Sequence, residues 1–258
     1  MFYYKKQTPD YDYLAPDGSE IRLLPGVRKG SSAHCILPPG KITKPVKHKT
    51  VEEIWYVISG QGKMWQKSNE TVNVVDLTEG VVITIPTGNH FQFANTGQEP
   101  LSLLIFTIPP WPGAHEAVDV EDLSQEKTDN SKLIFHHKVL PERYDELAPD
   151  TSEIRFLART HRASCGHCVL PPGKTSNAVK HKTIEELWYV LSGEGEMWQR
   201  SDDMECLLKL KKDLALTIAT GNHFQLRNTG SEPLCIVLLT MPPWQNEHEA
   251  VTVDQHWK

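Results

Sequence analysis

The sequence VKHKTVEEIWYVISG, from Val46 to Gly60, returns almost unchanged as VKHKTIEELWYVLSG, from Val179 to Gly193. The offset between the copies is 133 residues, the difference between His48 and His181, and no insertion changes it elsewhere. Segments on both sides repeat with the same offset: LAPD at 14–17 and 147–150, SEIR at 19–22 and 152–155, LPPGK at 37–41 and 170–174. A period of this length is a whole domain rather than a solenoid repeat, so the sequence predicts a duplicated domain.

A polar stretch, EDLSQEKTDNSK at 121–132, separates the two copies. It holds almost no large apolar residue, which is typical of an exposed linker. We therefore expect one domain over 1–120, a linker over 121–132 and a second domain over 133–258.

Short β-branched or aromatic runs alternate with turn residues in each copy. EEIWYVISG at 52–60 and VVITIP at 81–86 are examples, and Gly60-Gln61-Gly62 indicates a tight hairpin. No window shows a helical period longer than about ten residues. Closely spaced antiparallel strands of this kind predict an all-β fold, with a jelly-roll barrel in each half.

The composition excludes several classes of partner. A net charge of −6 argues against nucleic-acid binding and against electrostatic attachment to anionic lipid. No stretch approaches the length needed to span a bilayer, and Met1–Asp10 lacks the apolar core of a secretion signal. We expect a cytoplasmic protein whose partner is a small-molecule ligand, with no nucleic acid and no membrane.

The chain has five cysteines, which in the absence of such a signal predicts free thiols rather than a disulfide framework. Cys165 and Cys168 have the Cys-x-x-Cys spacing of zinc ribbons and thioredoxin-like redox sites, but neither a second pair nor a βαβ context accompanies them. Cys168 matches Cys35 in the first copy as an apolar strand residue. We therefore expect buried thiols without chemistry.

The stretch from Pro38 to Gly62 resembles the first sequence motif of the cupin superfamily, in which two histidines, a glutamate and a glycine are spaced along two strands. His48, Glu53 and Gly60 match the second histidine, the glutamate and the glycine; their counterparts are His181, Glu186 and Gly193. The stretch 80–95 resembles the second motif, and its counterpart departs from it at Asp213 and Ala219. The resemblance implies two tandem double-stranded β-helix (jelly-roll) barrels related by pseudo-twofold symmetry.

The resemblance also implies a divalent metal, Fe, Mn, Ni, Co or Zn, held by histidines and a glutamate inside the barrel, where open positions take substrate or dioxygen. Glu53 and Glu186 are then both ligands and candidate catalytic residues. The candidate metal ligands are His34, His48, Glu53 and His90 in the first copy and His167, His181, Glu186 and His223 in the second. The absence of any metal stays open as an alternative.

The chain departs from the family pattern in two places. Val46 and Val179 stand where the first histidine belongs. His90 comes one residue early, so Phe91 takes the ligand position; a one-residue shift turns a side chain to the other face unless a bulge re-aims it. His34 and His167, on the strand leading into LPPG, are the candidates to replace the missing imidazole.

Aromatic and amide side chains are expected to line the cavities: Trp55, Trp65 and Gln92 in the first copy, and Trp188, Trp198 and Gln225 in the second. Two functions remain open. One is metal-dependent chemistry of dioxygenase, isomerase or cyclase type on a small organic acid, sugar or polyketide-like compound. The other is small-molecule binding without catalysis, as in cupin sensor and storage proteins. We expect a monomer with an internal pseudo-dimer, or a homo-oligomer.

Overall fold

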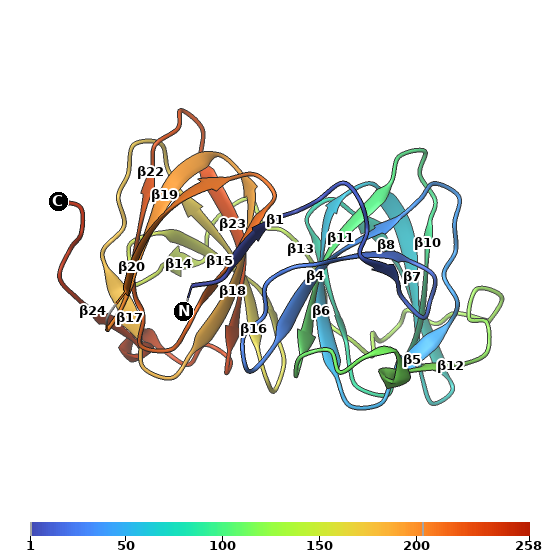
Figure 1. Ribbon diagram of the computed structural model, residues 1–258. Helices are drawn as coiled ribbons and strands as arrows, with labels where there is room; N and C mark the ends of the chain where they lie inside the picture. Colours follow the sequence, from blue (N-terminus) through green and yellow to red (C-terminus); the bar gives the residue numbers. More distant parts are fainter. Residues whose placement is uncertain (1, 203) are drawn as a thin grey trace. The chain divides into compact units, whose positions relative to one another are not determined.

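The computed structural model describes residues 2–202 and 204–258. The chain folds into two compact units, each built on one barrel of antiparallel strands (Figure 1). Barrel 1 comprises Thr8–Leu24 and Gly30–Val139, and barrel 2 comprises residues 2–7, Pro25–Lys29 and Leu140–Lys258. The expected all-β fold is confirmed, because the described helices are two single 3₁₀ turns, η1 (Ala114–Glu116) and η2 (Glu247–Glu249). None of the described helices has the length and apolar character that a membrane span requires.

Barrel 1 is made of two sheets. The seven-stranded sheet has, in spatial order, β13 (His137–Val139), β9 (Val81–Ile85), β6 (Glu52–Ser59), β11 (Leu101–Ile108), β4 (Ser31–Leu37), β3 (Glu20–Leu23) and β2 (Tyr13–Leu14). The five-stranded sheet has β12 (Ala117–Asp119), β5 (Val46–His48), β10 (His90–Asn95), β7 (Gln61–Ser68) and β8 (Thr71–Thr78). Alternate residues of both sheets point into one apolar core, which includes Trp55, Phe91 and Phe93.

Barrel 2 repeats this order strand by strand. Its seven-stranded sheet has β1 (Tyr4–Lys6), β21 (Leu214–Ile218), β18 (Glu185–Ser192), β23 (Leu234–Met241), β16 (Ser164–Leu170), β15 (Glu153–Arg159) and β14 (Glu146–Leu147). Its five-stranded sheet has β20 (Met204–Lys211), β19 (Glu194–Ser201), β22 (His223–Asn228), β17 (Val179–His181) and β24 (Ala250–Thr252). The shared topology is the structural counterpart of the 133-residue repeat.

Each barrel is completed by a strand that lies outside its expected domain. β1, from the N-terminal end of the chain, pairs with β21 of barrel 2, and β13, from the expected second domain, pairs with β9 of barrel 1. The boundaries 1–120 and 133–258 therefore differ from the compact units. The two strands satisfy the edge backbone groups of β9 and β21. A comparison of the repeats does not reveal this exchange, because β1 and β13 are equivalent segments of the two copies, 133 residues apart. The offset is therefore the same whichever barrel each strand joins.

The stretch 121–132 lies against barrel 1, although most of its residues are exposed as their composition indicates. The Leu123 side chain is buried, and its N–H donates to Gln92 Oε1 (2.9 Å). The Asp129 N–H donates to the Val72 carbonyl (2.8 Å), and the Asn130 amide pairs with both backbone groups of Val74 (3.0 and 2.8 Å). The stretch is therefore exposed to solvent on its outer side and hydrogen-bonded to the outer edge of β8.

Gly60 joins β6 to β7 where the chain passes very close to a neighbouring strand. Its φ is +89°, and an added Cβ would lie 2.5 Å from the Pro100 carbonyl oxygen and 2.8 Å from the Leu101 Cα. Gly193 repeats this arrangement in barrel 2, 2.4 Å from the Pro233 carbonyl oxygen. Both the turn and the close approach require glycine.

Candidate functional site

Each barrel encloses a cavity between its two sheets. The cavity measures about 800 Å³ in barrel 1 and about 680 Å³ in barrel 2, open mouths included. Aliphatic and aromatic side chains form most of the walls; in barrel 1 they include Tyr13, Val46, Trp55, Phe91 and Trp111. A small number of polar groups converges between them, which is the usual design of a small-molecule site.

A histidine and a glutamate meet in the cavity of barrel 1. His48 ends β5, and Glu53 follows on β6 with its side chain on the same inner face as that of Trp55. The His48 Nδ1 lies 3.9 Å from Glu53 Oε2. Trp55 Nε1 donates to Glu53 Oε2 (2.8 Å) and Thr107 Oγ1 donates to Oε1 (3.0 Å), so the carboxyl group is held from both sides.

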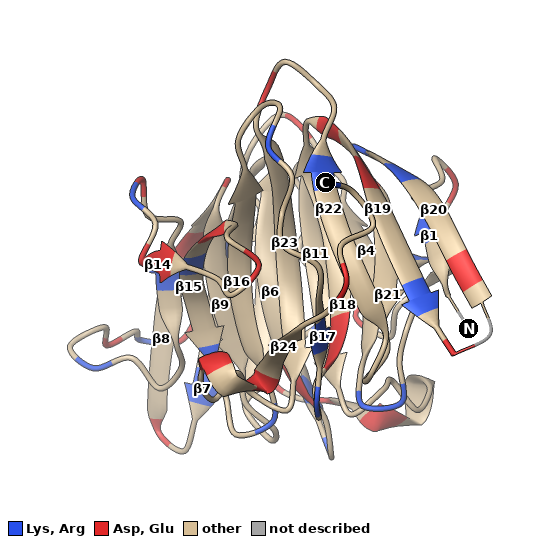
Figure 2. Cartoon of the chain, turned by 90° about the vertical axis from the view of Figure 1, so that its left-hand side faces the viewer, with Lys and Arg blue, Asp and Glu red and all other residues tan. Residues whose placement is uncertain are grey.

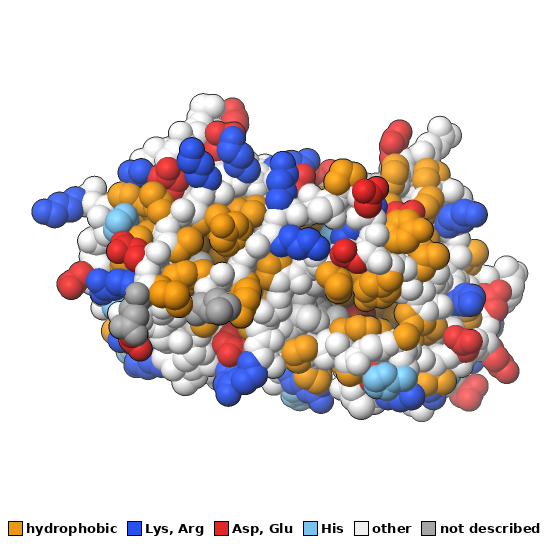
Figure 3. All heavy atoms as spheres, viewed as in Figure 1, with side chains coloured by type: hydrophobic (Ala, Val, Ile, Leu, Met, Phe, Trp, Pro, Cys, Tyr) orange, Lys and Arg blue, Asp and Glu red, His pale blue; other side chains and the backbone are white. Residues whose placement is uncertain are grey.

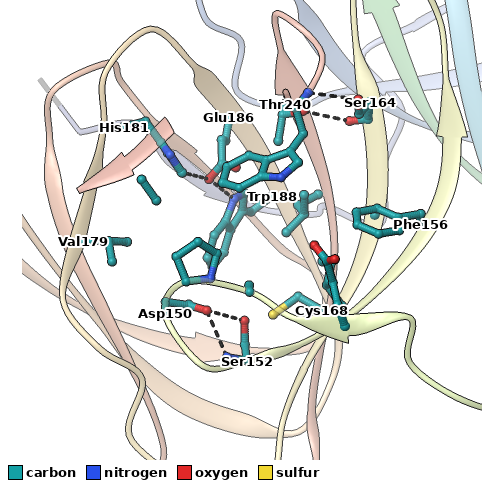
Figure 4. A pocket seen from close by; sticks show the side chains of 18 of the residues that line it. Asp150, Ser152, Phe156, Ser164, Cys168, Val179, His181, Glu186, Trp188 and Thr240 are labelled. Carbon is teal, nitrogen blue, oxygen red and sulfur yellow. Dashed lines mark hydrogen bonds and ion pairs between the residues drawn. The ribbon is translucent and has the colours of Figure 1, made fainter. Parts of the chain in front are cut away.

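Barrel 2 has the same pair, drawn in Figure 4, with a shorter separation. His181 Nε2 lies 3.4 Å from Glu186 Oε2, which also accepts a hydrogen bond from Trp188 Nε1 (2.9 Å). Thr240 donates instead to the Ser164 carbonyl (3.4 Å). Two of the four expected cavity tryptophans, Trp55 and Trp188, therefore line the site and orient its glutamate.

A second carboxyl group lies in each cavity, and sequence reasoning missed it. Asp17 Oδ1 accepts hydrogen bonds from the Ser19 N–H (2.9 Å) and hydroxyl (2.7 Å), and Asp150 makes the same two bonds with Ser152 (3.0 and 2.6 Å). Both aspartates are buried and line the cavities. The available signal was the repeated LAPD segment, which marks these positions without indicating a chemical role.

Burial governs the titration of these acids. It raises the pKa of Asp17 and of Asp150, against the opposing effect of their serine partners. Burial also raises the pKa of Glu53, although His48, Trp55 and Thr107 favour its ionised form. In barrel 2, burial opposes protonation of His181, but the adjacent Glu186 carboxylate outweighs it and raises the pKa of this imidazole.

His90 and His223 lie outside the cavities. The pairing of β10 with β7 is regular from His90 to Asn95, with no bulge to turn the imidazole inward. Phe91 lines the cavity instead, with its ring centroid 5.0 Å from that of His48. His223 has the same outward position, where its Nδ1 lies 3.0 Å from Arg200 Nη2. His90 and His223, two of the candidate metal ligands expected from the sequence, therefore point outward and do not join the site.

His34 and His167 do not replace the missing imidazoles. Each lies between cavity-side neighbours on its strand and so points to the opposite face. His34 Nε2 hydrogen-bonds Ser102 Oγ (2.7 Å). Burial, with a smaller effect of Arg22 and Arg155, lowers the pKa of both histidines to about 4, so they are neutral side chains of the fold.

Acidification is expected to destabilise the fold through these two groups. The pKa of His34 is about 4 in the folded chain, whereas the ordinary value for a solvated histidine is 6.5. Between these values the unfolded chain binds more protons, so stability falls as the pH drops through this window. The test compares the wild type with His34→Gln, a variant that keeps a partner for Ser102, by thermal unfolding at about pH 7 and about pH 5. The stability lost between the two pH values should be smaller in the variant by roughly 1–2 kcal/mol. An equal loss in variant and wild type would contradict this assignment.

Four further expected cavity residues lie on outer faces. Trp65 alternates with the buried Met64 and Gln66, and Trp198 stacks on His256 with ring centroids 4.9 Å apart. Gln92 holds the 121–132 stretch through its bond to Leu123, and Gln225 accepts from the backbone of His256 (2.8 Å) and Trp257 (2.9 Å). Gln92 thus holds the 121–132 stretch, and Trp198 and Gln225 hold the C-terminal residues, against the outside of the barrels.

The donor set does not fit the metal site that the family pattern implies. Within residues 2–202 and 204–258, no three His, Cys, Asp or Glu side chains come close enough to hold one ion. Val46 and Phe91, at the two remaining ligand positions, line the cavity with carbon atoms. Each barrel thus brings together one imidazole and one glutamate, whereas metal sites of this kind use three or four protein ligands.

Cys165 and Cys168 are buried free thiols, as expected. Burial raises the pKa of both, which keeps them protonated and unreactive. Cys168 contributes to the core of barrel 2 as Cys35 does in barrel 1.

Comparison with known proteins places this architecture. A family model described as "Cupin domain" matches residues 33–107 and again 166–240. An uncharacterized protein of Methanocaldococcus jannaschii is 37% identical over 113 residues, which are 42% of this chain and 86% of that protein.

Several solved structures superpose on most of this chain. A variant of Bacillus subtilis oxalate decarboxylase superposes with a TM-score of 0.77 at 14% identity, over 97% of this chain and 79% of that one. The coconut allergen cocosin superposes with a TM-score of 0.72 at 13% identity, over 93% of this chain and 85% of that one. At these identities the likeness shows the fold alone.

Proposed function

The chain belongs to the cupin domain family, with one domain in each barrel, and from this premise we propose that each barrel binds a small organic molecule. The ligand has an apolar body and a hydrogen-bond-donating head group, preferably a cationic nitrogen. The buried histidine–glutamate pair exchanges a proton with that head group. The observation that carries the proposal is the apolar cavity that holds this pair and has a second carboxyl group in its wall.

The charges of the cavity walls support a donor or a cation. The described lining of barrel 1 holds the carboxyl groups of Asp17 and Glu53 and no lysine or arginine. In barrel 2 the lining holds Asp150 and Glu186 in the same way, and Glu146 stands where barrel 1 has Tyr13. Aromatic faces beside buried carboxylates suit an organic ammonium group. The same walls disfavour an organic acid, one of the ligand classes expected from the sequence.

The acid–base role rests on one ring nitrogen of each histidine whose hydrogen-bonding capacity is not used by the described residues. His48 Nδ1 and His181 Nδ1 are buried and have no hydrogen-bond partner among the described residues. A buried nitrogen of this kind is costly unless a bound group or a proton uses it. An imidazole beside a glutamate can take a proton from a bound molecule and return it, which is the step that isomerases and cyclases need.

Binding without chemistry is the second candidate, and one observation favours it. Both oxygens of Glu53 already accept hydrogen bonds from Trp55 and Thr107, so the carboxyl group serves the fold as well as any ligand. A pure binding site would hold its ligand through shape and charge alone.

Phenethylamine, an aromatic ammonium probe, is expected to bind and to raise the unfolding temperature, whereas phenylpropionate, an anion of similar size, does not. Calorimetry at about pH 5 in two buffers of different ionisation enthalpy should show proton release. Burial raises the pKa values of Asp17 and Glu53, so these groups hold their protons more strongly than ordinary carboxyl groups do, and the ammonium group favours their ionised forms.

Two variants make the experiment specific. Glu53→Gln is expected to weaken the barrel 1 site by at least about tenfold, because it removes a buried charge. Glu52→Gln, on the adjacent residue of β6, is the matched control and should bind like the wild type. Tighter binding of phenylpropionate than of phenethylamine would overturn the proposed ligand class. Binding without proton release would overturn the coupling between the ligand and these carboxyl groups.

A further inference from the structure

The outer edge of β20 in barrel 2 carries unpaired backbone groups. All eight residues of this strand pair with β19 on one side, and β20 ends the five-stranded sheet (Figure 2). Across the part of the chain that the structure describes, no backbone hydrogen bond reaches the other side of β20. Such an edge is a template for another strand.

The equivalent edge in barrel 1 is covered. There the 121–132 stretch bonds to β8 through Asp129 and Asn130, which use the outward backbone groups of Val72 and Val74. The repeat places Glu205 and Leu207 of β20 at these two positions, so their outward groups are the ones left unused. The edge of β8 in barrel 1 therefore shows the same strand position with its outward backbone groups paired, whereas those of β20 are left without a partner strand.

Apolar side chains accompany the uncovered edge. Leu207 is 55% exposed and Met204 is 48% exposed, in a strand whose other end, Leu210, is fully buried. Figure 3 shows hydrophobic side chains at the surface in this region of barrel 2. β20 also contains no proline, so its backbone is open to strand addition along its whole length.

We propose that β20 pairs with β20 of a second copy of this chain in an antiparallel arrangement centred on Leu207. The outward groups belong to alternate residues, Glu205, Leu207 and Lys209, so these must face one another. Centring on Leu207 places the Leu207 side chains of the two copies opposite each other. On either side of them, Glu205 of one copy faces Lys209 of the other, so all three are favourable cross-strand pairs. The edge is therefore complementary to itself in shape, hydrogen bonding and charge.

Sedimentation equilibrium of the full chain tests this pairing. The wild type is expected to dimerise, and Leu207→Lys to weaken the dimer at least about tenfold, because it sets two ammonium groups opposite each other. Leu207→Pro provides a second test, since it removes an N–H that the single chain does not use but the dimer does. Circular dichroism and the unfolding temperature establish that both variants fold.

Val74→Lys is the matched control, because it makes the same change at the repeat-related position, where the edge is already covered, and should leave the dimer intact. A wild type that stays monomeric overturns the proposal, and is the result expected if a different protein, or nothing, uses this edge. A dimer unchanged by both Leu207 variants, or equally weakened by Val74→Lys, overturns it as well.

Discussion

Replacing Gly60 by alanine is expected to destabilise barrel 1 by about 3 kcal/mol or more. The new Cβ would meet two backbone atoms, the Pro100 carbonyl oxygen at 2.5 Å and the Leu101 Cα at 2.8 Å, and backbone cannot rotate aside as a side chain can. The residue must also keep its φ of +89°. Urea unfolding followed by tryptophan fluorescence would measure the loss, since Trp55 and Trp65 lie in the strands that Gly60 joins.

Gly88→Ala is the matched control for this prediction. Gly88 has a similar φ, +82°, but an added Cβ would meet nothing within 4 Å. This variant therefore carries only the cost of the left-handed backbone, about 1 kcal/mol. Equal losses in the two variants would mean that conformation, rather than the close approach to Pro100, makes glycine necessary at Gly60.

The double variant Val46→His, Phe91→His is expected to complete the metal-ligand set that the cupin motif implies. Val46 and Phe91 are direct partners between β5 and β10, and both line the cavity beside His48 and Glu53. Two imidazoles there would complete a set of three histidines and one glutamate. Titration with Co²⁺, followed by its visible absorption, should show affinity at least about 100-fold above that of the wild type.

The control keeps Val46→His and adds Gln92→His in place of Phe91→His. Gln92 is adjacent to Phe91 but points to the outer face, where it contacts Leu123, so the second imidazole cannot reach the cavity. Metal analysis of the purified wild type measures whether the natural chain already binds an ion. One tightly bound ion per barrel in the natural chain would show that His48 and Glu53, with their counterparts in barrel 2, suffice to hold a metal.

The repeat and the short apolar runs predict two β-rich domains, because they are properties of single strands and their order. The pairing of His48 with Glu53 is expected from the resemblance to the cupin motif. The period-two pattern of a strand shows which residues share a face, but it does not show which of the two faces points into the cavity. Trp65 and Gln92 are as apolar or as buried as cavity residues, yet they pack on outer faces of the barrel.

Asp17 shows a different limit of sequence reasoning. It lies in a turn, at the end of LAPD, and only the folded chain brings that turn beside His48. Its repetition at Asp150 marks the position, but repetition alone does not separate a cavity residue from a structural one. The exchanged strands are hidden for a related reason, since pairing between distant segments leaves no local pattern.

The exchange of β1 and β13 has an evolutionary consequence. A cut within the stretch 121–132 would separate each barrel from the strand that completes its seven-stranded sheet. A single barrel keeps its edge strand only if the cut follows β13, after Val139, or if a deletion joins β1 directly to the second copy. The position of the junction, rather than the loss of one copy, therefore decides whether one barrel can outlive the other.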